Sequence, residues 1–319
     1  MQVVQGHNVN TVWIDGLWRL KLSGLVEESR VGRVKVLPEP LTSVYEKPWE
    51  RVLFHPIRDA NPFFHLIEAL WMLAGSEDLA FLEVYNTRMA EFSDDKVILN
   101  GAYGFRWRQL FERDQLLDIV AMLRADRTTR RAVLEMWDPM MDLDSKSKDI
   151  PCNTHAYFRV RDGLLDMTVC CRSNDAVWGA YGANAVHFSI LHEFIARACY
   201  LGQGRMYQVS NNFHIYEQHW PLLEVPVVLK NYYHNSPEIV WPLFEDHTEA
   251  EFFLLDCERM VDGELDFATY FFNRVVYPAI TAWALYKDGK LLQALDALAV
   301  MPVCVWHFAM EEWLERRVK

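Results

Sequence analysis

A cysteine, Cys152, and an arginine, Arg172, lie at the two ends of one predicted β-hairpin. Residues 157–169 contain Asp162-Gly163, a dipeptide typical of the type I′ turn that joins two antiparallel strands. Cys152 stands just before the first strand, and Arg172 follows the second. Because hairpin strands pair side by side, the thiol and the guanidinium are expected to meet in one sheet. The hairpin therefore predicts a fold built around a sheet that carries reactive groups.

Helical and strand patterns alternate before residue 220, whereas the chain beyond it is mostly helical and rich in aromatic residues. The segment 61–75 illustrates a helix, with Pro62 near its start, apolar residues at helical spacing and Gly75 at its end. The sequence predicts helices at 61–75, 115–123, 184–200, 249–260 and in most of 291–317, and strands at 132–137 and 206–209. We therefore expect an α+β catalytic body at residues 1–220 and a helical C-terminal extension at 221–319 packed on it.

Composition excludes several classes of protein. The net charge of −12 argues against general nucleic-acid binding. No run approaches the roughly 20 apolar residues of a membrane span, and the N-terminus lacks a signal-peptide pattern. The six cysteines have neither metal-ligand spacing nor a disulfide pattern. We expect a cytoplasmic, reduced protein that binds no metal.

Several side chains are candidates for chemistry on a phosphorylated substrate. A thiolate at Cys152 would be nucleophilic, and a neighbouring Arg172 would lower its pKa and hold a phosphate. The alternative for Cys152 is a buried structural cysteine. Glu68 lies in an apolar helix, where a carboxylate is either functional or part of a salt bridge. His187 and His192 are interpreted as helix-face residues rather than ligands.

The order of these residues resembles the thymidylate synthase family over residues 29–220. The matching motifs occur in family order: Ser29-Arg30-Val31-Gly32, Ile67-Glu68-Ala69-Leu70-Trp71, Ala102-Tyr103-Gly104-Phe105-Arg106-Trp107, Asp114-Gln115, Arg130-Arg131 then Trp137, Pro151-Cys152, Arg172-Ser173-x-Asp175-x-x-x-Gly179, and His214-x-Tyr216. The resemblance implies the family fold, a mixed sheet with packed helices.

The resemblance also implies a role for each matching residue. Cys152 would attack C6 of a pyrimidine nucleoside monophosphate, and 5,10-methylenetetrahydrofolate would be the co-substrate. Glu68, Tyr103 and Asp175 would join Cys152 as catalytic residues. Asp175 and Trp107 would face the folate. The nucleotide would be bound by Arg30, Arg172 and Ser173 at the phosphate, Asn184 at the pyrimidine edge, and His214 and Tyr216 at the ribose. The protein would be a homodimer in which Arg130 and Arg131 reach the phosphate of the nucleotide bound to the neighbouring subunit.

Four departures from the family concern the last step of the reaction. Asn153 replaces the usual His after the nucleophile, and residues 85–92 contain no tryptophan. The segment Gly179–Asn184 is one residue longer than the family's Gly-x-Pro-Phe-Asn. The chain ends in charged residues after a helical region instead of a short apolar tail. A wetter site favours capture of the methylene intermediate by water over hydride transfer.

These departures resemble the pyrimidine-nucleotide 5-hydroxymethylases of phages with modified DNA, which would act in the host cytoplasm. An amide at position 184 favours uracil, so dUMP is the expected substrate, with dCMP and CMP as alternatives. A divergent thymidylate synthase that makes dTMP is the second hypothesis. The third is a non-catalytic nucleotide-binding homologue.

Overall fold

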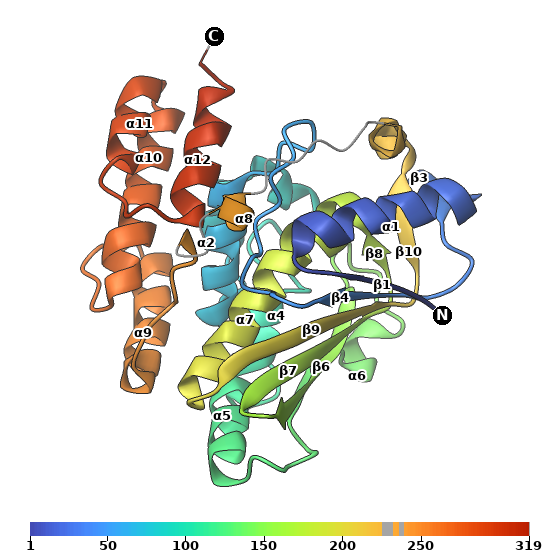
Figure 1. Cartoon of the computed structure of the whole chain (residues 1–319), viewed down its shortest axis with the longest axis horizontal. Helices are drawn as coiled ribbons and strands as arrows, with labels where there is room; N and C mark the ends of the chain where they lie inside the picture. The colour runs from blue at the N-terminus through green and yellow to red at the C-terminus, as the bar shows by residue number, and fades with distance from the viewer. Residues whose placement is uncertain (225–231, 236–238, 319) are drawn as a thin grey trace.

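A six-stranded sheet forms one outer layer of the computed structural model, which describes residues 1–224, 232–235 and 239–318. Its strand order is β1 (Gln2–Gly6), β4 (Leu41–Tyr45), β9 (Gly202–Ser210), β7 (Leu164–Cys171), β6 (Asn153–Arg161) and β5 (Val133–Glu135). The pairs β1–β4 and β7–β9 are parallel and the others antiparallel. The sheet is therefore mixed, which confirms the predicted α+β class (Figure 1).

The predicted hairpin is present as β6 and β7. Asp162 and Gly163 both have positive φ angles, 50° and 77°, as a type I′ turn requires. β5 is shorter than the predicted strand 132–137. Its pairing stops because one carbonyl, that of Thr154, accepts hydrogen bonds from the backbone N–H groups of both Met136 and Trp137. β9 extends beyond the predicted 206–209, since its glycine-containing start also pairs with β7.

Helix α7 (Asn184–Ala198) separates the sheet from the rest of the molecule. It packs on β7 and β9 on one side and on α2 (Pro62–Leu73) on the other. Nearly all of its residues are buried, including polar ones, because it is covered on both sides. α2 begins after the N-cap Asn61 and ends before Gly75, whose φ is +76°. Both helices were predicted, and together they form the central layer of the core (Figure 1).

A second sheet of four strands brings distant parts of the chain together. Its order is β2 (Leu25–Ser29), β3 (Gly32–Val36), β10 (Phe213–Tyr216) and β8 (Asn174–Asp175). β10 pairs with β3 on one side and with β8 on the other. The β2–β3 turn, β8 and the end of β10 therefore lie at the same edge of this sheet, although about 140 residues separate the turn from β8 and about 185 separate it from the end of β10.

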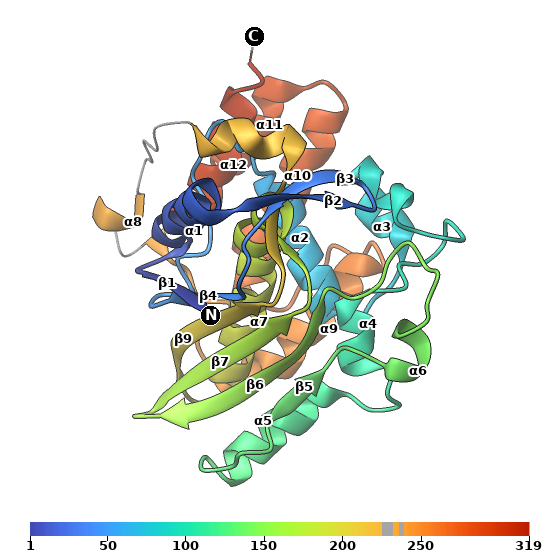
Figure 2. The same cartoon turned by 90° about the vertical axis from the view of Figure 1, so that its right-hand side faces the viewer.

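The helices after residue 220 form a group beyond α2 (Figures 1 and 2). α9, α10 and α12 each contact α2, so the group closes the core on the side opposite to the sheet. α12 is tied to the body because Arg316 and Arg317, which follow it, both pair with Asp59. These elements are α8 (Tyr232–Asn235), α9 (Ala250–Val261), α10 (Tyr277–Lys287), α11 (Leu291–Leu298) and α12 (Val305–Glu315), with a π-helix at Phe272–Val276 and a 3-10 helix at His247–Glu249.

The remaining helices cover the edges of the body. They are α1 (Val9–Ser23), α3 (Leu79–Glu83), α4 (Tyr103–Arg108), α5 (Gln115–Ala125) and α6 (Pro139–Asp142), with a π-helix at Ala176–Ala183 and 3-10 helices at Thr87–Glu91 and Glu217–Leu223. α5 confirms the predicted helix at 115–123. Among the described residues, no helix has the length and apolar character that a bilayer span requires.

Candidate active site

Cys152 lies where the chain enters β6, half-buried and fixed through its backbone. Its N–H donates to the hydroxyl of Tyr103 at 3.0 Å, and the N–H of Asn153 donates to the same oxygen at 2.9 Å. On its other side, the carbonyl of Cys152 accepts the N–H of Arg172 at 2.8 Å. The start of α4 and the end of β7 therefore hold the thiol between them.

Burial dominates the acidity of this thiol. It raises the pKa of Cys152, Arg172 and Arg30 oppose the rise, and the carboxyl of Asp149 adds to it. The arginine contribution has the direction expected from sequence, but the net shift is upward because desolvation of the thiolate is larger. At neutral pH the free protein thus holds Cys152 as a thiol, and nucleophilic attack requires removal of its proton.

Two arginines flank Cys152 from different sheets. The guanidinium of Arg172 donates to the carbonyls of Pro151 at 2.8 Å and Ile150 at 3.0 Å, yet the residue is exposed. Arg30 lies in the exposed turn between β2 and β3 and acts electrostatically on both Cys152 and Tyr216. Ser173 follows Arg172 and is partly exposed. Two exposed guanidinium groups near one thiol have the charge and the hydrogen-bond donors that a phosphate requires.

Asn184 lies beside the nucleophile even though the segment before it is one residue longer than in the family. The extra residue is accommodated by the π-helix Ala176–Ala183, whose turns hold more residues than those of an α-helix. Gly182 is required there, since a Cβ atom would lie 2.7 Å from the carbonyl oxygen of Val177. The amide oxygen of Asn184 then accepts from Asn153 at 3.2 Å.

Asp175, His214 and Tyr216 form the neighbouring part of the cluster. Asp175 and His214 pair across β8 and β10, and the rings of His214 and Tyr216 are 5.1 Å apart. Asp175 caps the π-helix through one oxygen, while its other oxygen is buried without a hydrogen-bond partner. Burial raises the pKa of Asp175 to about 6 despite these backbone bonds and the charge of Arg58.

Glu68 on α2 faces His187, to which no functional role was assigned from the sequence. The Nε2 atom of His187 lies 3.1 Å from Oε2 of Glu68, with 4% and 14% of the two side chains exposed. The two atoms are not aligned as a hydrogen bond, and neither has another hydrogen-bond partner. His187 thus lies on the face of α7 that is turned toward α2, and its contact with Glu68 was not predicted from the sequence. Its position three residues after Asn184 is the signal that was available, since both then lie near one face of α7.

Asp149 is a second carboxyl near the nucleophile that sequence reasoning missed. It accepts the backbone N–H of Gly101 at 2.7 Å. Burial raises its pKa, and the charge of Glu68 raises it further, while the Gly101 bond and Arg106 lower it. A partly buried carboxyl that interacts with both Cys152 and Glu68 is able to take part in proton exchange at this site.

An exposed aromatic ring between two arginines was also missed. The guanidinium carbons of Arg58 and Arg88 lie 4.8 and 5.7 Å from the ring centre of Trp178, which is 46% exposed. Arg58 is only 8% exposed, and one of its terminal nitrogens has no hydrogen-bond partner. Trp107, by contrast, is 1% exposed and stacks behind Tyr103, so it supports the site from the core rather than facing a ligand.

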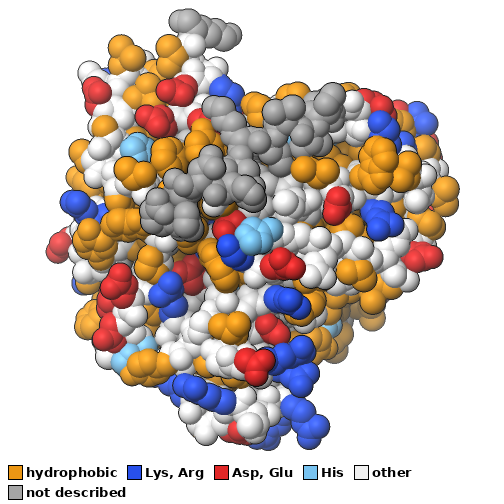
Figure 3. Space-filling view, viewed as in Figure 1, with side chains coloured by type: hydrophobic (Ala, Val, Ile, Leu, Met, Phe, Trp, Pro, Cys, Tyr) orange, Lys and Arg blue, Asp and Glu red, His pale blue; other side chains and the backbone are white. Residues whose placement is uncertain are grey.

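Arg130 and Arg131 are not part of this cluster. Both are exposed in the loop between α5 and β5, and neither forms an ion pair with any described residue. Figure 3 shows Lys and Arg side chains gathered at the lower edge of the molecule, in the region where Figure 1 places α5 and this loop. The structure therefore leaves these two arginines free to contact another molecule.

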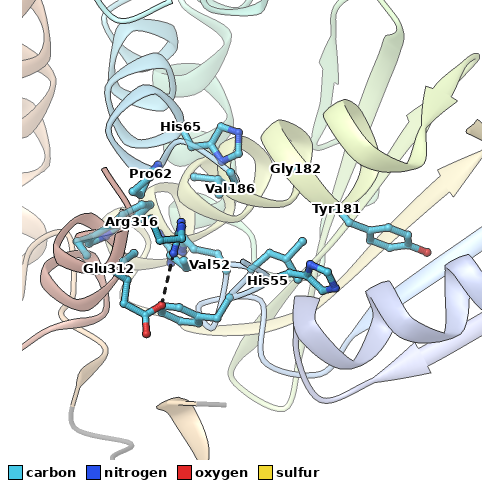
Figure 4. A pocket seen from close by; sticks show the side chains of 15 residues that line it. Val52, His55, Pro62, His65, Tyr181, Gly182, Val186, Glu312 and Arg316 are labelled. Carbon is cyan, nitrogen blue, oxygen red and sulfur yellow. Dashed lines mark ion pairs between the residues drawn. The ribbon is translucent and has the colours of Figure 1, made fainter. Parts of the chain in front are cut away.

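A small cavity of about 30 Å³ lies between the start of α2, the π-helix and α12. Figure 4 shows His65, Gly182 and the pair Glu312–Arg316 around it. None of the predicted site residues lines it, so it is separate from the cluster around Cys152. In the described ranges, no group of three or more His, Cys, Asp or Glu is arranged to hold a metal ion.

Comparisons with known proteins identify the family of this chain. The thymidylate synthase family model matches residues 61–259. A protein of Pseudomonas phage M6 named deoxyuridylate hydroxymethyltransferase is 43% identical over 99% of this chain and 95% of its own length. The protein of the same name from Bacillus phage SP01 is 34% identical over 78% of this chain and 68% of its own length.

The fold has a solved counterpart as well. The thymidylate synthase of T4 phage superposes with a TM-score of 0.58 at 21% identity, over 68% of this chain and 82% of that one. At this level of identity the match concerns the fold alone. Together with the family model and the near full-length relative, it establishes that the chain belongs to the thymidylate synthase family.

Proposed function

We propose that this protein is a one-carbon transferase that converts dUMP to its 5-hydroxymethyl derivative, with 5,10-methylenetetrahydrofolate as co-substrate. The observation that carries the proposal is the 43% identity, over nearly the whole chain, to a phage protein named deoxyuridylate hydroxymethyltransferase. The amide of Asn184 beside Cys152 supports it. An amide can accept from N3–H and donate to O4 of uracil.

The phosphate of the nucleotide binds Arg172, Arg30 and Ser173. This assignment is supported by the exposed positions of both guanidinium groups and by their electrostatic effect on Cys152. His214 and Tyr216, adjacent on β10, hold the 3′-hydroxyl of the ribose.

Cys152 then starts the reaction by forming a bond from its sulfur to C6 of the pyrimidine. The electron pair of the C5–C6 double bond moves toward O4, and C5 becomes nucleophilic. The amide of Asn184 stabilises the charge on O4, and Glu68, paired with His187, organises proton transfer through water. Tyr103 keeps the backbone of Cys152 in place with two hydrogen bonds.

The residues around Asp175 fit a folate. One oxygen of Asp175 and one nitrogen of Arg58 are buried without partners, and the exposed ring of Trp178 lies between two arginines. These groups suit a ligand that combines ring N–H donors, an aromatic ring and carboxylates. When bound, 5,10-methylenetetrahydrofolate supplies the one-carbon unit that C5 receives.

Water, rather than hydride, completes the reaction in this proposal. Residues 85–92 contain no indole that could shield the site, and Tyr85 stacks on Trp283 of α10, with 7% of it exposed. The polar Asn153 lies next to the nucleophile. The alternative is a divergent thymidylate synthase, which would produce dTMP and dihydrofolate.

One product assay separates these functions. The protein is incubated with dUMP, and separately with dCMP, in the presence of methylenetetrahydrofolate, and the nucleotide and folate products are identified by mass spectrometry. 5-Hydroxymethyl-dUMP with tetrahydrofolate is the expected result, and dTMP with dihydrofolate would refute water capture. Cys152→Ala should abolish turnover while retaining nucleotide binding. Full activity of that variant, or no turnover by the unmodified protein, would contradict the mechanism.

The same proposal includes a homodimer in the cytoplasm of the host, with residues 1–220 as catalytic body and 221–319 as helical extension. Arg130 and Arg131 serve the site of the neighbouring subunit, which is supported by their exposure and by the absence of an ion pair between them and any described residue. If they act across the interface, mixing the inactive Cys152→Ala protein with an Arg130→Ala/Arg131→Ala variant should restore part of the activity. No restoration after confirmed subunit exchange would refute this arrangement.

A further inference from the structure

Three buried asparagines form a continuous line of hydrogen bonds through the candidate site. The amide nitrogen of Asn153 donates to the oxygen of Asn184 at 3.2 Å, and the nitrogen of Asn184 donates to the oxygen of Asn174 at 3.1 Å. The nitrogen of Asn174 donates to the hydroxyl of Ser210 at 2.9 Å. The three amides are 0%, 7% and 1% exposed, so water cannot replace these bonds freely. We call this line, from Asn153 to Ser210, the amide relay.

The amides of the relay must share one direction. Each has a donor end and an acceptor end, and each donor must face an acceptor. If Asn184 alone turned over, its oxygen would face the oxygen of Asn174, and its nitrogen would face the nitrogen of Asn153. Buried polar groups left opposite like groups are unfavourable. The direction of Asn184 is therefore fixed by its two neighbours.

The direction of this amide matters for recognition of the base. Uracil presents a donor at N3 and an acceptor at O4, whereas cytosine presents an acceptor at N3 and a donor at N4. The same amide turned by 180° would match the other base. An Asn184 side chain held in one orientation therefore forms hydrogen bonds with one pyrimidine and places like groups opposite each other with the second.

We propose that Asn174 is a positioning residue that sets the preference for uracil over cytosine by fixing the direction of the Asn184 amide. This inference rests on the proposed function. Asn174 lies one amide beyond Asn184 in the relay, so it acts on the base only through Asn184. Asn184 uses one N–H and one lone pair within the relay and retains a second of each for the base.

The framework holds Asn174 firmly enough for this role. It lies on β8, pairs with Phe213 of β10, and its backbone N–H donates to the carbonyl of Asn212 at 2.8 Å. The chain also passes close to its side chain at Gly179, where a Cβ atom would lie 2.7 Å from the oxygen of Asn174. Because the side chain of Asn174 is held by these contacts, its oxygen stays oriented toward the nitrogen of Asn184.

The test compares Asn174→Leu with Asn174→Asp. Leu has a similar shape and no polar atoms, so it removes the anchor. Ionised Asp presents only acceptor oxygens, so it accepts from the nitrogen of Asn184 and keeps the direction, provided that the assay pH lies above the pKa of this carboxyl. Dissociation constants for dUMP and dCMP are measured by calorimetry, and kcat/KM for each nucleotide is measured with methylenetetrahydrofolate.

We expect the ratio of dUMP to dCMP affinity to fall by about tenfold or more in Asn174→Leu, because the amide can then adopt both directions. The ratio should be retained in Asn174→Asp. Ser210→Ala removes only the far end of the relay and should lower the ratio less, which keeps the test available if the Leu variant does not fold.

An unchanged ratio in both Asn174→Leu and Ser210→Ala, even with a uniform loss of affinity, would overturn the inference and leave Asn174 a purely structural role. A preference for dCMP in Asn174→Asp would overturn the direction assigned to the relay. Failure of the proposed function itself is recognised separately, since the unmodified protein would then neither bind nor convert dUMP.

Discussion

Replacement of Asp142 by Asn tests whether the buried ion pair between Arg106 and Asp142 stabilises the fold and helps to position Cys152. The guanidinium of Arg106 reaches the two carboxylate oxygens of Asp142 at 2.6 and 2.9 Å, and both side chains are 1% exposed. Arg106 belongs to α4, the helix that begins at Tyr103, and the hydroxyl of Tyr103 receives the backbone N–H of Cys152. Loss of this pair should therefore affect both the stability of the fold and the position of the nucleophile.

The size of the effect follows from burial. Two unit charges about 4 Å apart interact by about 4 kcal/mol at an effective dielectric constant of roughly 20. Removal of one partner of a buried pair typically costs about 3–5 kcal/mol, because the remaining charge stays desolvated. The carbonyls of Asn100 and Met136 still accept from Arg106, so we expect a value near the lower limit. For a chain of 319 residues, about 3 kcal/mol lowers Tm by roughly 4–5 °C.

The assay is thermal unfolding followed by circular dichroism, together with urea titration. Asp118→Asn is the matched control: Arg113 and Asp118 are also 2.6 Å apart, but their side chains are 63% and 44% exposed. Screening by solvent should leave the Tm of this control close to that of the unmodified protein. If Asp142→Asn melts at the same temperature as the control, burial does not determine the strength of this pair and the reasoning fails.

Three further predictions concern acidity, the C-terminal helix and the π-helix. Burial raises the pKa of Cys152 and Arg172 opposes the rise, so the rate at which iodoacetamide alkylates Cys152 should increase with pH. At pH 8 this rate should be lower in Arg172→Leu than in the unmodified protein, and a rate independent of pH would contradict the reasoning. Burial tends to raise the pKa of Asp59, but its partners Arg316 and Arg317 lower that pKa overall, so the stability that Asp59 contributes is present above its unfolded pKa and is lost as the pH falls through its folded pKa. Amide exchange in α12, corrected for intrinsic rates, should therefore become faster below pH about 4, and Asp59→Asn should remove this pH dependence. Gly182→Ala should lower kcat/KM for the nucleotide at least about tenfold by displacing the π-helix. Gly263→Ala is strained only in its own backbone, at φ +80°, and has open space around its Cβ, so it should cost stability but retain kcat/KM; an equal loss of kcat/KM in both variants would argue against a special role for the close approach.

Local patterns were enough to predict most of the elements. The hairpin turn at Asp162-Gly163, α2, α5 and α7 were predicted because turn preference and the spacing of apolar residues are local properties. Strand ends were less predictable. The end of β5 depends on a carbonyl of the neighbouring strand, and such a partner cannot be identified from the sequence of β5 itself.

The order of motifs along the chain was enough by itself to determine the family, and it predicts Cys152 as the nucleophile and the arginines at the phosphate. Only the tertiary structure decided how these groups act on one another. It showed that burial outweighs the arginines in setting the pKa of Cys152, that a π-helix keeps Asn184 beside the nucleophile, and that Asn174 completes a relay of amides. The physical reason is that desolvation and hydrogen-bond direction depend on neighbours that are distant in sequence, and folding brings them together.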